Sequence, residues 1–375
     1  MKQSIYADNA ATTRLDVDAF EAMKPFLLEE YGNASQPYFF ASKSKQALKK
    51  AREIIASCIG AAPEEVYFTS GGTESDNWAL KCFGQPSAER IILTSSIEHH
   101  AVLHASKGAV RLAVDAKGIV SPALLELSLS SHIDSNCNSS AALVSIMLAN
   151  NEIGTIEPIS SLAETAHAHG AFFHTDAVQA IGHIPVDVNA LHIDMLSASA
   201  HKFNGPKGIG FLYVRKGTPL QPFMDGGAQE SGNRAGTENV AGIVGMAVAL
   251  QKNCCDMQQN SEKLHTMEQL FLDTLRHANV DFILNGADDR IPGNVNISIR
   301  DASGEMLLHR LDLKGISIST GSACDSVNTQ VSHVIQAIGV PDAYAKGTVR
   351  VSFGRYNEIN DAAEVANAIV RVINH

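Results

Sequence analysis

A lysine between an apolar stretch and a glycine-rich turn is the first residue whose setting suggests chemistry. Lys202 lies in residues 197–210, which read SASAHKFNGPKGIG. A lysine among small and apolar residues can lose part of its hydration, which lowers its pKa and suits it to forming a Schiff base. Most lysines are solvated surface residues, but the Ser-x-His-Lys context makes Lys202 the leading candidate for a catalytic amine.

Two adjacent glycines suggest a second site, for an anion. Residues 69–77 read TSGGTESDN, so a predicted strand ends, two glycines follow, and a helix-compatible stretch begins. Glycine lets the backbone approach an anion closely, and the free N–H groups at a helix start favour a phosphate. An ordinary strand-to-helix turn explains the glycine pair equally well, and the sequence holds no GxxxxGK[ST] nucleotide loop.

An aspartate ends another predicted strand. In residues 174–179, HTDAVQ, Asp176 would lie at the carboxyl edge of a parallel sheet, where such sheets bind ligands. Taken alone, Asp176 is better explained as the cap of a following helix.

One of the six cysteines has a setting that suggests reactivity. Cys324 lies in SISTGSACDS at 317–326, where five of the ten residues are Ser or Thr, a composition typical of a flexible loop rather than a core. An exposed cysteine can act as a nucleophile when its thiolate is accessible. The remaining cysteines have apolar helical, polar-loop or adjacent-pair contexts and are Cys58, Cys82, Cys137, Cys254 and Cys255.

The 15 histidines raise the question of a metal site. His100 and His104 are four residues apart and could share a helix face, but no third ligand is identifiable nearby. His167 and His169 are two apart and would point to different faces. We therefore expect no metal.

The elements around these residues alternate between short apolar runs and helical stretches, which predicts an α/β domain with a largely parallel sheet and helices on both faces. A helix is expected at 159–169. Strands are expected at 66–69, 90–94, 142–148, 171–174, 195–198 and 209–214.

After Gly236 the pattern changes. A helix with apolar residues at helical spacing begins near Val240 and is expected to continue toward His277. A last helix is expected near Asn357, a plausible N-cap. Strands are expected at 281–284, 294–299 and 349–353. The simplest interpretation is a smaller α+β domain over roughly 255–375.

Composition excludes several classes of protein. The chain has 375 residues, enough for two or three packed units. Basic residues number 29 and acidic residues 40, for a net charge of −11 spread along the chain, which argues against nucleic acid as a partner. The longest apolar runs, 141–149 and 241–250, are about half a membrane span, so no membrane insertion is expected. The absence of CxxC and of an apolar segment at the N-terminus makes the cytoplasm the expected location.

Together, these segments resemble the cysteine desulfurases, which are pyridoxal phosphate (PLP) enzymes of the class V aminotransferase group with the fold-type I architecture. The resemblance runs nearly end to end, from YADNAATT at 6–13 to VRVSFGR at 349–355. Intermediate matches are TSGGTESDN (69–77), EHHAVL (98–103), NNEIGT (150–155), HTDAVQ (174–179), SASAHKFNGPKGIG (197–210), QESGNRAGTENV (229–240) and STGSAC (319–324). Their order and spacing together make the match specific.

The resemblance implies a PLP-dependent transferase fold of type I. A large PLP-binding α/β domain, with a mostly parallel sheet flanked by helices, would cover residues 15–255. A small α+β domain would cover residues 1–14 and 256–375 and carry a mobile loop with Cys324.

The resemblance also implies residue roles. Lys202 would bind PLP covalently, Asp176 would pair with the ring nitrogen and keep it protonated, and Gln179 would bind the ring hydroxyl while His99 stacks on the ring. Asn151 and Arg350 would clamp the substrate carboxylate, for which a planar guanidinium is suited. The phosphate would be held by Gly72 and Thr73, Ser199 and His201, and by Thr237 from the partner subunit of a homodimer.

The implied reaction converts L-cysteine to L-alanine. Lys202 would act as the general base, and Cys324 would attack the substrate sulfur and carry it as a persulfide to an acceptor protein of unknown identity, for iron–sulfur or other sulfur-cofactor assembly. Two alternatives stay open: a related PLP lyase or aminotransferase, such as a selenocysteine lyase, and a non-catalytic PLP-fold binding protein. Retention of Lys202, Asp176, His99, Arg350 and Cys324 argues against the second alternative.

Some positions depart from the family's pattern. Residues 32–38 read GNASQPY where GNPSS-x-H is usual, so Ala34, Gln36 and Tyr38 are replacements, and Ala228 stands where a third glycine is common. These departures leave the predicted PLP residues intact but bear on the entrance of the site, and so on substrate preference. The spacing after Cys324 suggests the long loop of the housekeeping-type subgroup.

Overall fold

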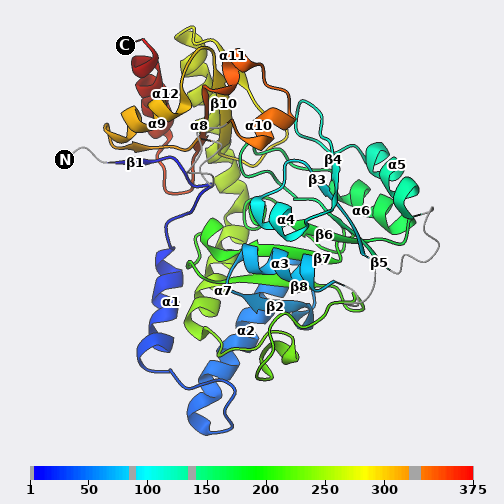
Figure 1. Cartoon of the computed structure of the whole chain (residues 1–375). Helices are drawn as coiled ribbons and strands as arrows, with labels where there is room; N and C mark the ends of the chain where they lie inside the picture. The colour runs from blue at the N-terminus through cyan, green and yellow to red at the C-terminus, as the bar shows by residue number, and fades with distance from the viewer. Residues whose placement is uncertain (1–3, 84–89, 134–140, 321–330, 375) are drawn as a thin grey trace.

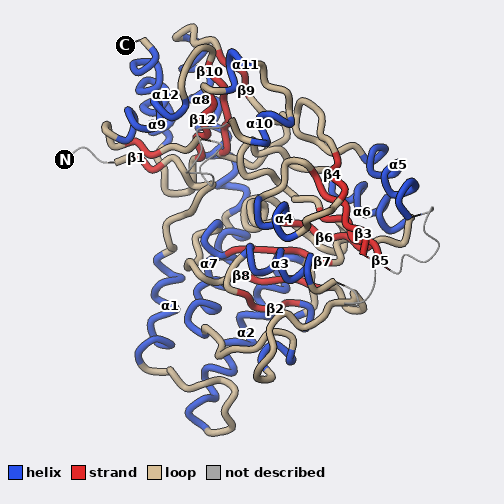
Figure 2. The backbone as a smooth tube through the Cα atoms, viewed as in Figure 1, coloured by secondary structure: helices blue, strands red, loops and turns tan. Residues whose placement is uncertain are grey.

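The computed structural model describes residues 4–83, 90–133, 141–320 and 331–374. Its strands gather in two places, a large central sheet and a smaller group above it (Figure 2). The described part of each terminus lies near the smaller group (Figure 1).

The large sheet has seven strands, all parallel except β8, which runs antiparallel to both of its neighbours. In spatial order its strands are β2 (Val66–Thr69), β8 (Gly210–Val214), β7 (Met195–Ser199), β6 (Phe172–Asp176), β5 (Ala141–Ser145), β3 (Arg90–Ser95) and β4 (Val110–Leu112). The runs are rich in branched and aromatic residues, which suits strands buried on both faces.

Successive residues of these strands enter different cores because side chains alternate across a strand. Leu143 and Met195 pack on one face with Trp78 of α3. Val144 and Leu196 pack on the other face. The helices of this domain are α1 (Val17–Leu28), α2 (Ser42–Ile59), α3 (Gly72–Lys81), α4 (His100–Ala105), α5 (Pro122–Ile133), α6 (Ile159–Ala168) and α7 (Val240–Cys255).

A second apolar core forms around an antiparallel sheet of three strands. This sheet has the order β12 (Thr348–Ser352), β10 (Asn294–Ile299) and β9 (Phe282–Leu284). The nearby helices are α8 (Met257–His277), α9 (Gly304–Asp312), α10 (His333–Ala337), α11 (Asp342–Ala345) and α12 (Ile359–Ile373). The N-terminal strand β1 (Ile5–Tyr6) pairs in parallel with β11 (Ile316–Ser317), and Ile5 joins this second core. We retain the division at residues 14/15 and 255/256 as a proposal, which the two separate cores support.

The predicted fold class is confirmed, with a mostly parallel sheet flanked by helices and a smaller α+β unit. Two local predictions are wrong. The long helix toward His277 is interrupted at Asp256, where α7 ends and α8 begins. The N-cap of α12 is Glu358 rather than Asn357, whose side chain instead accepts hydrogen bonds from the backbone N–H of Gly354 and from Asn9.

Candidate functional site

Three strand ends meet at one edge of the large sheet. Thr69 pairs with Gly210, and Gly210 pairs with Ser199, so the last residues of β2 and β7 lie in register on either side of β8. Asp176, the last residue of β6, pairs with Ser197 two residues before the end of β7. The carboxyl ends of parallel strands form the usual ligand-binding edge of such a sheet.

Lys202 lies just beyond this edge. It ends a short 3-10 helix, η3 (Ala200–Lys202), that directly follows β7. Its Nζ donates to the carbonyl oxygens of Ala10 at 2.6 Å and Ala11 at 2.9 Å. The amine is therefore held against the N-terminal segment rather than extended into solvent.

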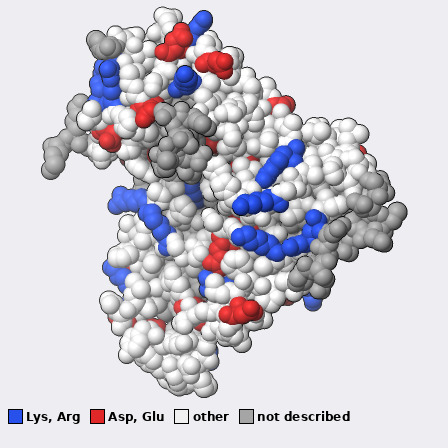
Figure 3. All heavy atoms as spheres, in the orientation of Figure 1, with Lys and Arg blue, Asp and Glu red and all other residues white. Residues whose placement is uncertain are grey.

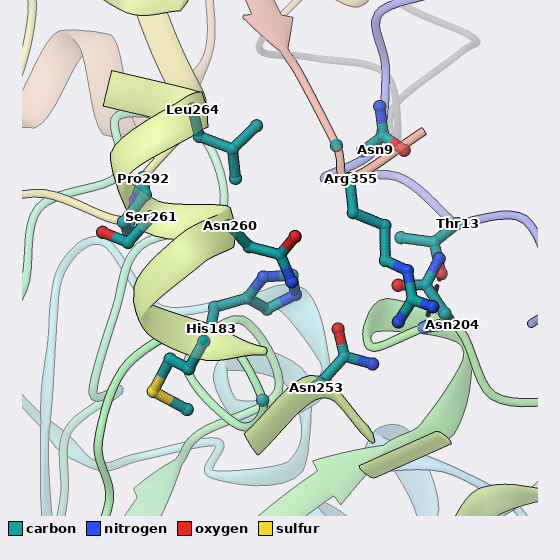
Figure 4. A pocket seen from close by; sticks show the side chains of 13 residues that line it. Asn9, Thr13, His183, Asn204, Asn253, Asn260, Ser261, Leu264, Pro292 and Arg355 are labelled. Atoms are coloured by element: carbon teal, nitrogen blue, oxygen red, sulfur yellow. Dashed lines mark hydrogen bonds between the residues drawn. The ribbon is translucent and has the colours of Figure 1, made fainter. Parts of the chain in front are cut away.

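Two side chains contact the backbone carbonyl groups of Lys202 and its neighbour. Nε2 of His183 lies 2.9 Å from the Lys202 carbonyl oxygen, and Nδ2 of Asn253 donates to the Phe203 carbonyl at 2.7 Å. Both side chains line a cavity of about 20 Å³, large enough for one water molecule (Figure 4). Polar side chains from both domains surround it, among them Asn9, Thr13, Asn204 and Arg355. This cavity is too small for a substrate, and polar side chains line much of it.

Asp176 and Gln179 face the same N-terminal segment. Asp176 is 5% exposed, and its Oδ1 accepts from the backbone N–H of Val178 at 2.9 Å. Burial raises the pKa of Asp176 to about 6, while the hydrogen bond from Val178 and the charge of Lys202 act in the opposite direction. Nε2 of Gln179 donates to the Ala10 carbonyl at 3.0 Å, the same oxygen that Lys202 contacts.

His99 caps the helix α4 that starts beside the site. Its Nδ1 accepts from the backbone N–H of Ala101 at 3.1 Å, so the ring proton is on Nε2. Burial and the charge of Lys202 lower the pKa of His99 to about 4. The imidazole is therefore neutral at physiological pH.

The predicted phosphate residues are partly brought together. Gly71 has a φ of +152°, which residues with side chains rarely adopt, and a Cβ built there would lie 3.4 Å from Oγ of Ser199. Gly72 and Thr73 open α3, and the His201 ring lies 3.2 Å from Oγ1 of Thr12. Thr237 is exposed and lines a different hollow, with Phe68 and Arg234. Of the predicted phosphate residues, Gly72, Thr73 and Ser199 are therefore brought together, at the start of α3 and the end of β7.

Arg350 lies in β12 and is 5% exposed. Its guanidinium donates to the Asn151 carbonyl at 2.8 Å and to Oδ1 of Asp8 at 2.6 Å, while its buried Nε has no hydrogen-bond partner. Arg350 thus joins β12 to Asn151 and to the N-terminal segment. Its carboxylate partner here is Asp8.

Cys324 lies outside the described residues, but both flanks of its segment are tied to the site. On the N-terminal side, the backbones of Ser319 and Arg350 exchange hydrogen bonds of 3.0 and 2.7 Å. On the C-terminal side, Nε2 of His333 lies 3.1 Å from the carbonyl oxygen of Glu98, the residue before His99. The described residues on either side of this segment therefore lie beside Arg350 and beside Glu98, which precedes His99.

Several residues that contact the site were not predicted from the sequence. Asp8 and the carbonyl groups of Ala10 and Ala11 contact Arg350 and Lys202, although the YADNAATT segment had attracted attention only as a match to the family. The buried side chains of Asp76 and His174 were also missed. Their positions inside TSGGTESDN and HTDAVQ, beside residues already singled out, were the available signal.

Comparison with known proteins agrees with this geometry. The family model described as aminotransferase class-V matches residues 5–365. A cysteine desulfurase IscS from Dictyoglomus turgidum is 44% identical, over 100% of this chain and 95% of its own length. Another from Methanosarcina thermophila is 43% identical, over 99% and 92%.

Solved structures give the same result. A structure titled NIFS-like protein superposes with a TM-score of 0.89 at 34% identity, over 99% of this chain and 100% of its own. One described as SspA in complex with cysteine has a TM-score of 0.77 at 32% identity, over 95% and 100%. The chain belongs to the aminotransferase class-V family, among its cysteine desulfurases.

Proposed function

We propose that this protein is a PLP-dependent cysteine desulfurase that converts L-cysteine to L-alanine and takes the sulfur onto Cys324 as a persulfide. The observation that carries the proposal is the placement of the Lys202 amine. It lies at the carboxyl edge of the sheet, with a buried carboxylate, Asp176, acting on it and a neutral imidazole, His99, nearby.

The residues present fit PLP. The amine of the site suits the aldehyde of PLP, and the buried carboxylate suits its ring nitrogen. The carboxamide suits the ring hydroxyl, and the imidazole suits the ring face. Gly71 and Gly72 stand at the start of α3, and Gly72 packs so closely on Val178 that a Cβ there would lie 2.5 Å from Cγ2 of Val178. Backbone N–H groups at such a helix start suit a phosphate. Lys202, Asp176, Gln179 and His99 would hold the ring, with Gly72, Thr73, Ser199 and His201 at the phosphate.

When bound, PLP supplies an electron sink that stabilises negative charge at the substrate Cα. Asp176, ionised at neutral pH, would keep a proton on the ring nitrogen. Lys202 Nζ would take the Cα proton as a general base and return it later. Arg350 and Asn151 would orient the substrate carboxylate, because Arg350 is buried and has an Nε donor without a partner.

The sulfur transfer follows from a thiolate nucleophile. The thiolate of Cys324 forms an S–S bond to the substrate sulfur as the Cβ–S bond breaks. The electron pair of that bond stays with the carbon, which takes up a proton to become the methyl group of L-alanine. The anchors of residues 321–330, at Arg350 and at Glu98 beside His99, support an approach from this segment to the substrate.

We also propose that the protein is a homodimer, with Thr237 of the partner subunit completing the phosphate site. Large exposed apolar side chains on α1 and the segment after it support this proposal, namely Phe20, Leu27, Leu28, Tyr31, Phe39 and Phe40. A surface with this many exposed apolar side chains is typical of a protein–protein interface.

The sulfur acceptor is proposed to be a protein. In Figure 3, uncharged surface predominates, in keeping with a charged fraction of 18%, and several basic side chains gather on the right of the middle of this face. The net charge of −11 does not favour nucleic acid. Among the described residues, no helix is long and apolar enough to cross a membrane. A cytoplasmic location remains part of the proposal, on the basis of the cysteine usage.

The test is alanine and sulfide release from L-cysteine in the presence of a reducing thiol, for wild type, Cys324→Ala and Cys255→Ala. Cys255 is an exposed free cysteine and serves as the matched control. We expect equimolar products from wild type and from the control, and almost none from Cys324→Ala, with the visible absorption band of bound PLP kept in all three. Equal activity in Cys324→Ala would exclude the persulfide route and favour a lyase such as one acting on selenocysteine.

A further inference from the structure

Thr237, which the proposed function assigns to the phosphate site of the partner subunit, lies in a segment that is tied to its own chain on both sides. Thr237 is exposed and borders a hollow of about 180 Å³ that Arg234 and Ser70 also line. Two residues further along, Asn239 caps α7, with its Oδ1 accepting from the backbone N–H of Gly242 at 3.0 Å. The position of Thr237 therefore depends on what holds the chain before and after it.

Arg234 anchors this segment to α3. Its Nε donates to Oε1 of Glu74 at 2.8 Å, and its Nη2 donates to Oε2 at 3.2 Å. The two side chains are 22% and 11% exposed, so solvent screens their ion pair less than it screens a fully exposed pair. Oε2 of Glu74 also accepts from the backbone N–H of Ser70 at 2.8 Å. Burial pushes the pKa of Glu74 up, but the hydrogen bonds from Arg234 and Ser70 outweigh it and the pKa is lowered, so the pair is ionised at neutral pH.

A second anchor lies earlier in the same segment, at Glu230. Its carboxylate is 5% exposed and accepts from Nη1 and Nη2 of Arg52 at 2.9 and 2.7 Å, and from the backbone N–H of Phe68 in β2 at 2.9 Å. Glu230 and Ser231 have φ angles of +44° and +59°, which residues with side chains rarely adopt. Such a backbone persists where the surrounding contacts hold it in place, and it is frequent at binding sites.

The start of α3 thus has two neighbouring roles. Gly72 and Thr73 are the residues that the proposed function places at the phosphate of their own chain. Glu74, the next residue, holds the segment that carries Thr237. Because Thr73 and Glu74 are adjacent in one helical turn, a displacement of the helix start would move both the phosphate site of this chain and the anchor of Thr237.

We propose that Arg234 and Glu74 are positioning residues that couple the two phosphate sites of the dimer: their ion pair holds Thr237, offered to the partner subunit, on the helix start that serves the phosphate of its own chain. This inference rests on the proposed function, since it takes PLP as the cofactor and Thr237 as a contribution to the partner subunit. The guanidinium of Arg234 is engaged by Glu74 and by the Ala235 carbonyl at 3.4 Å. Arg234 therefore acts through Thr237 and does not itself bind the phosphate.

Titration of the cofactor-free protein with PLP, followed by the visible absorption band, tests the positioning role. We expect Arg234→Gln and Glu74→Gln each to raise the dissociation constant for PLP by about tenfold. The double variant should be no weaker than the weaker single variant, because the two residues share one contact. The matched control is Arg276→Gln, which breaks an exposed ion pair with Asp273 in α8 and should leave the dissociation constant unchanged. Single variants within about twofold of wild type, or losses that multiply in the double variant, would overturn the proposal.

Mixed dimers show which of the two sites depends on Arg234. One chain carries Lys202→Ala, so only the other chain gives the absorption band of lysine-bound PLP. With Arg234→Gln on the Lys202→Ala chain, the working site receives Thr237 from the altered segment, and its dissociation constant for PLP should rise by about tenfold. With Arg234→Gln on the working chain, Thr237 comes from an intact segment, and the rise should be clearly smaller. Equal rises, or a larger rise in the second arrangement, would overturn the coupling between the subunits.

Failure of the two ideas can be told apart. If wild type bound PLP but released no alanine from L-cysteine, the proposed function would fail, and the titrations would still decide the role of Arg234. If wild type released alanine and sulfide while Arg234→Gln bound PLP as tightly as wild type, only the inference about Arg234 would fail. Sedimentation that showed a PLP-binding monomer would overturn the coupling. If Arg234→Gln did not fold, Glu74→Gln in the same mixed dimers would decide.

Discussion

Asp16 is a buried carboxylate on which several segments converge, and replacing it should cost more stability than replacing any exposed acidic residue. It is 0% exposed and caps α1, with Oδ1 accepting from the backbone N–H groups of Asp18 at 2.8 Å and Ala19 at 3.2 Å. Its Oδ2 accepts from the guanidinium of Arg355 and from the Tyr356 hydroxyl. Lys252 of α7 lies 3.1 Å away.

The magnitude follows from these contacts. Loss of an N-cap costs about 1 kcal/mol. Loss of the partner of Arg355, whose side chain is 11% exposed, costs about 3 kcal/mol. The contact with Lys252, which is 34% exposed, is screened by solvent and adds well under about 1 kcal/mol. Asp16→Ala should therefore lower the free energy of unfolding by about 4 kcal/mol, and Asp16→Asn, which keeps the cap, by about 3 kcal/mol.

The assay is urea unfolding at one protein concentration, with Asp18→Ala as the matched control. Asp18 also contacts Lys252 but is 66% exposed, so its replacement should change stability by less than about 0.5 kcal/mol. Burial pushes the pKa of Asp16 up, but the hydrogen bonds from Lys252 and Tyr356 outweigh it and the pKa is lowered. The stabilisation is therefore complete above the unfolded-state pKa of about 4 and is lost as the pH falls through the folded-state value.

The difference between wild type and Asp16→Asn should thus be constant from pH 7.5 to about 5 and should narrow below about 4. A loss of less than about 1 kcal/mol in Asp16→Ala at pH 7.5 would refute the assignment of Asp16 as a buried anchor. A difference that widened on acidification would refute the sign of its pKa shift.

Three further predictions concern the site. Asp176→Asn should abolish most desulfuration and yet stabilise the cofactor-free protein above pH 6. Burial raises the pKa of Asp176 to about 6, so the ionised carboxylate destabilises the folded protein above that pH. Urea unfolding without PLP at pH 4 and pH 8 should show the gain in stability only at pH 8. His99→Asn keeps a side chain that can cap α4, and it should lower kcat about tenfold or more. The pH–rate profile should keep any limb that lies between pH 5 and 8, because the pKa of His99 is about 4 and His99 does not titrate there. Loss of such a limb in the variant would contradict the neutral state of His99. Arg350→Lys should raise KM for L-cysteine more than it lowers kcat, because an ammonium group cannot replace the planar guanidinium that reaches both Asn151 and Asp8. Steady-state kinetics measure both constants, and a larger fall in kcat than rise in KM would contradict this prediction.

The local parts of the fold could be predicted from the sequence because each apolar run carries its own signal. The strands at 66–69 and 294–299 have the expected bounds, and the runs around Phe172, Met195 and Gly210 differ from their strands by one or two residues. The run at 142–148 ends early as a strand, at Ser145, although Ile146 and Leu148 still donate to carbonyl groups of β6. Sequence periodicity detects burial there but not the point at which regular pairing ends.

The site was harder to predict, because its contacts join distant parts of the chain. Lys202 contacts Ala10 across 192 positions, and Arg350 contacts Asp8 across 342. No rule based on residue spacing predicts contacts between residues so far apart in the sequence. The break at Asp256 was missed for a related reason, since a hydrophilic stretch after an apolar helix continues the same helical spacing in the sequence. The roles of Lys202, Asp176 and Cys324 came from resemblance, and they stay predictions.

The N-terminal segment has a consequence for how the protein comes into being during synthesis. Asp8 bridges to Ser352, and Ala10 and Ala11 accept hydrogen bonds from Lys202, so the N-terminal segment is held by residues from the middle and from near the end of the chain. A nascent chain can form much of the large sheet once Val214 has left the ribosome. The amine of Lys202 and the guanidinium of Arg350 reach their places only after β12 has been made. Incomplete translation products would therefore lack the assembled site, because the N-terminal segment would have no β12 to pair with.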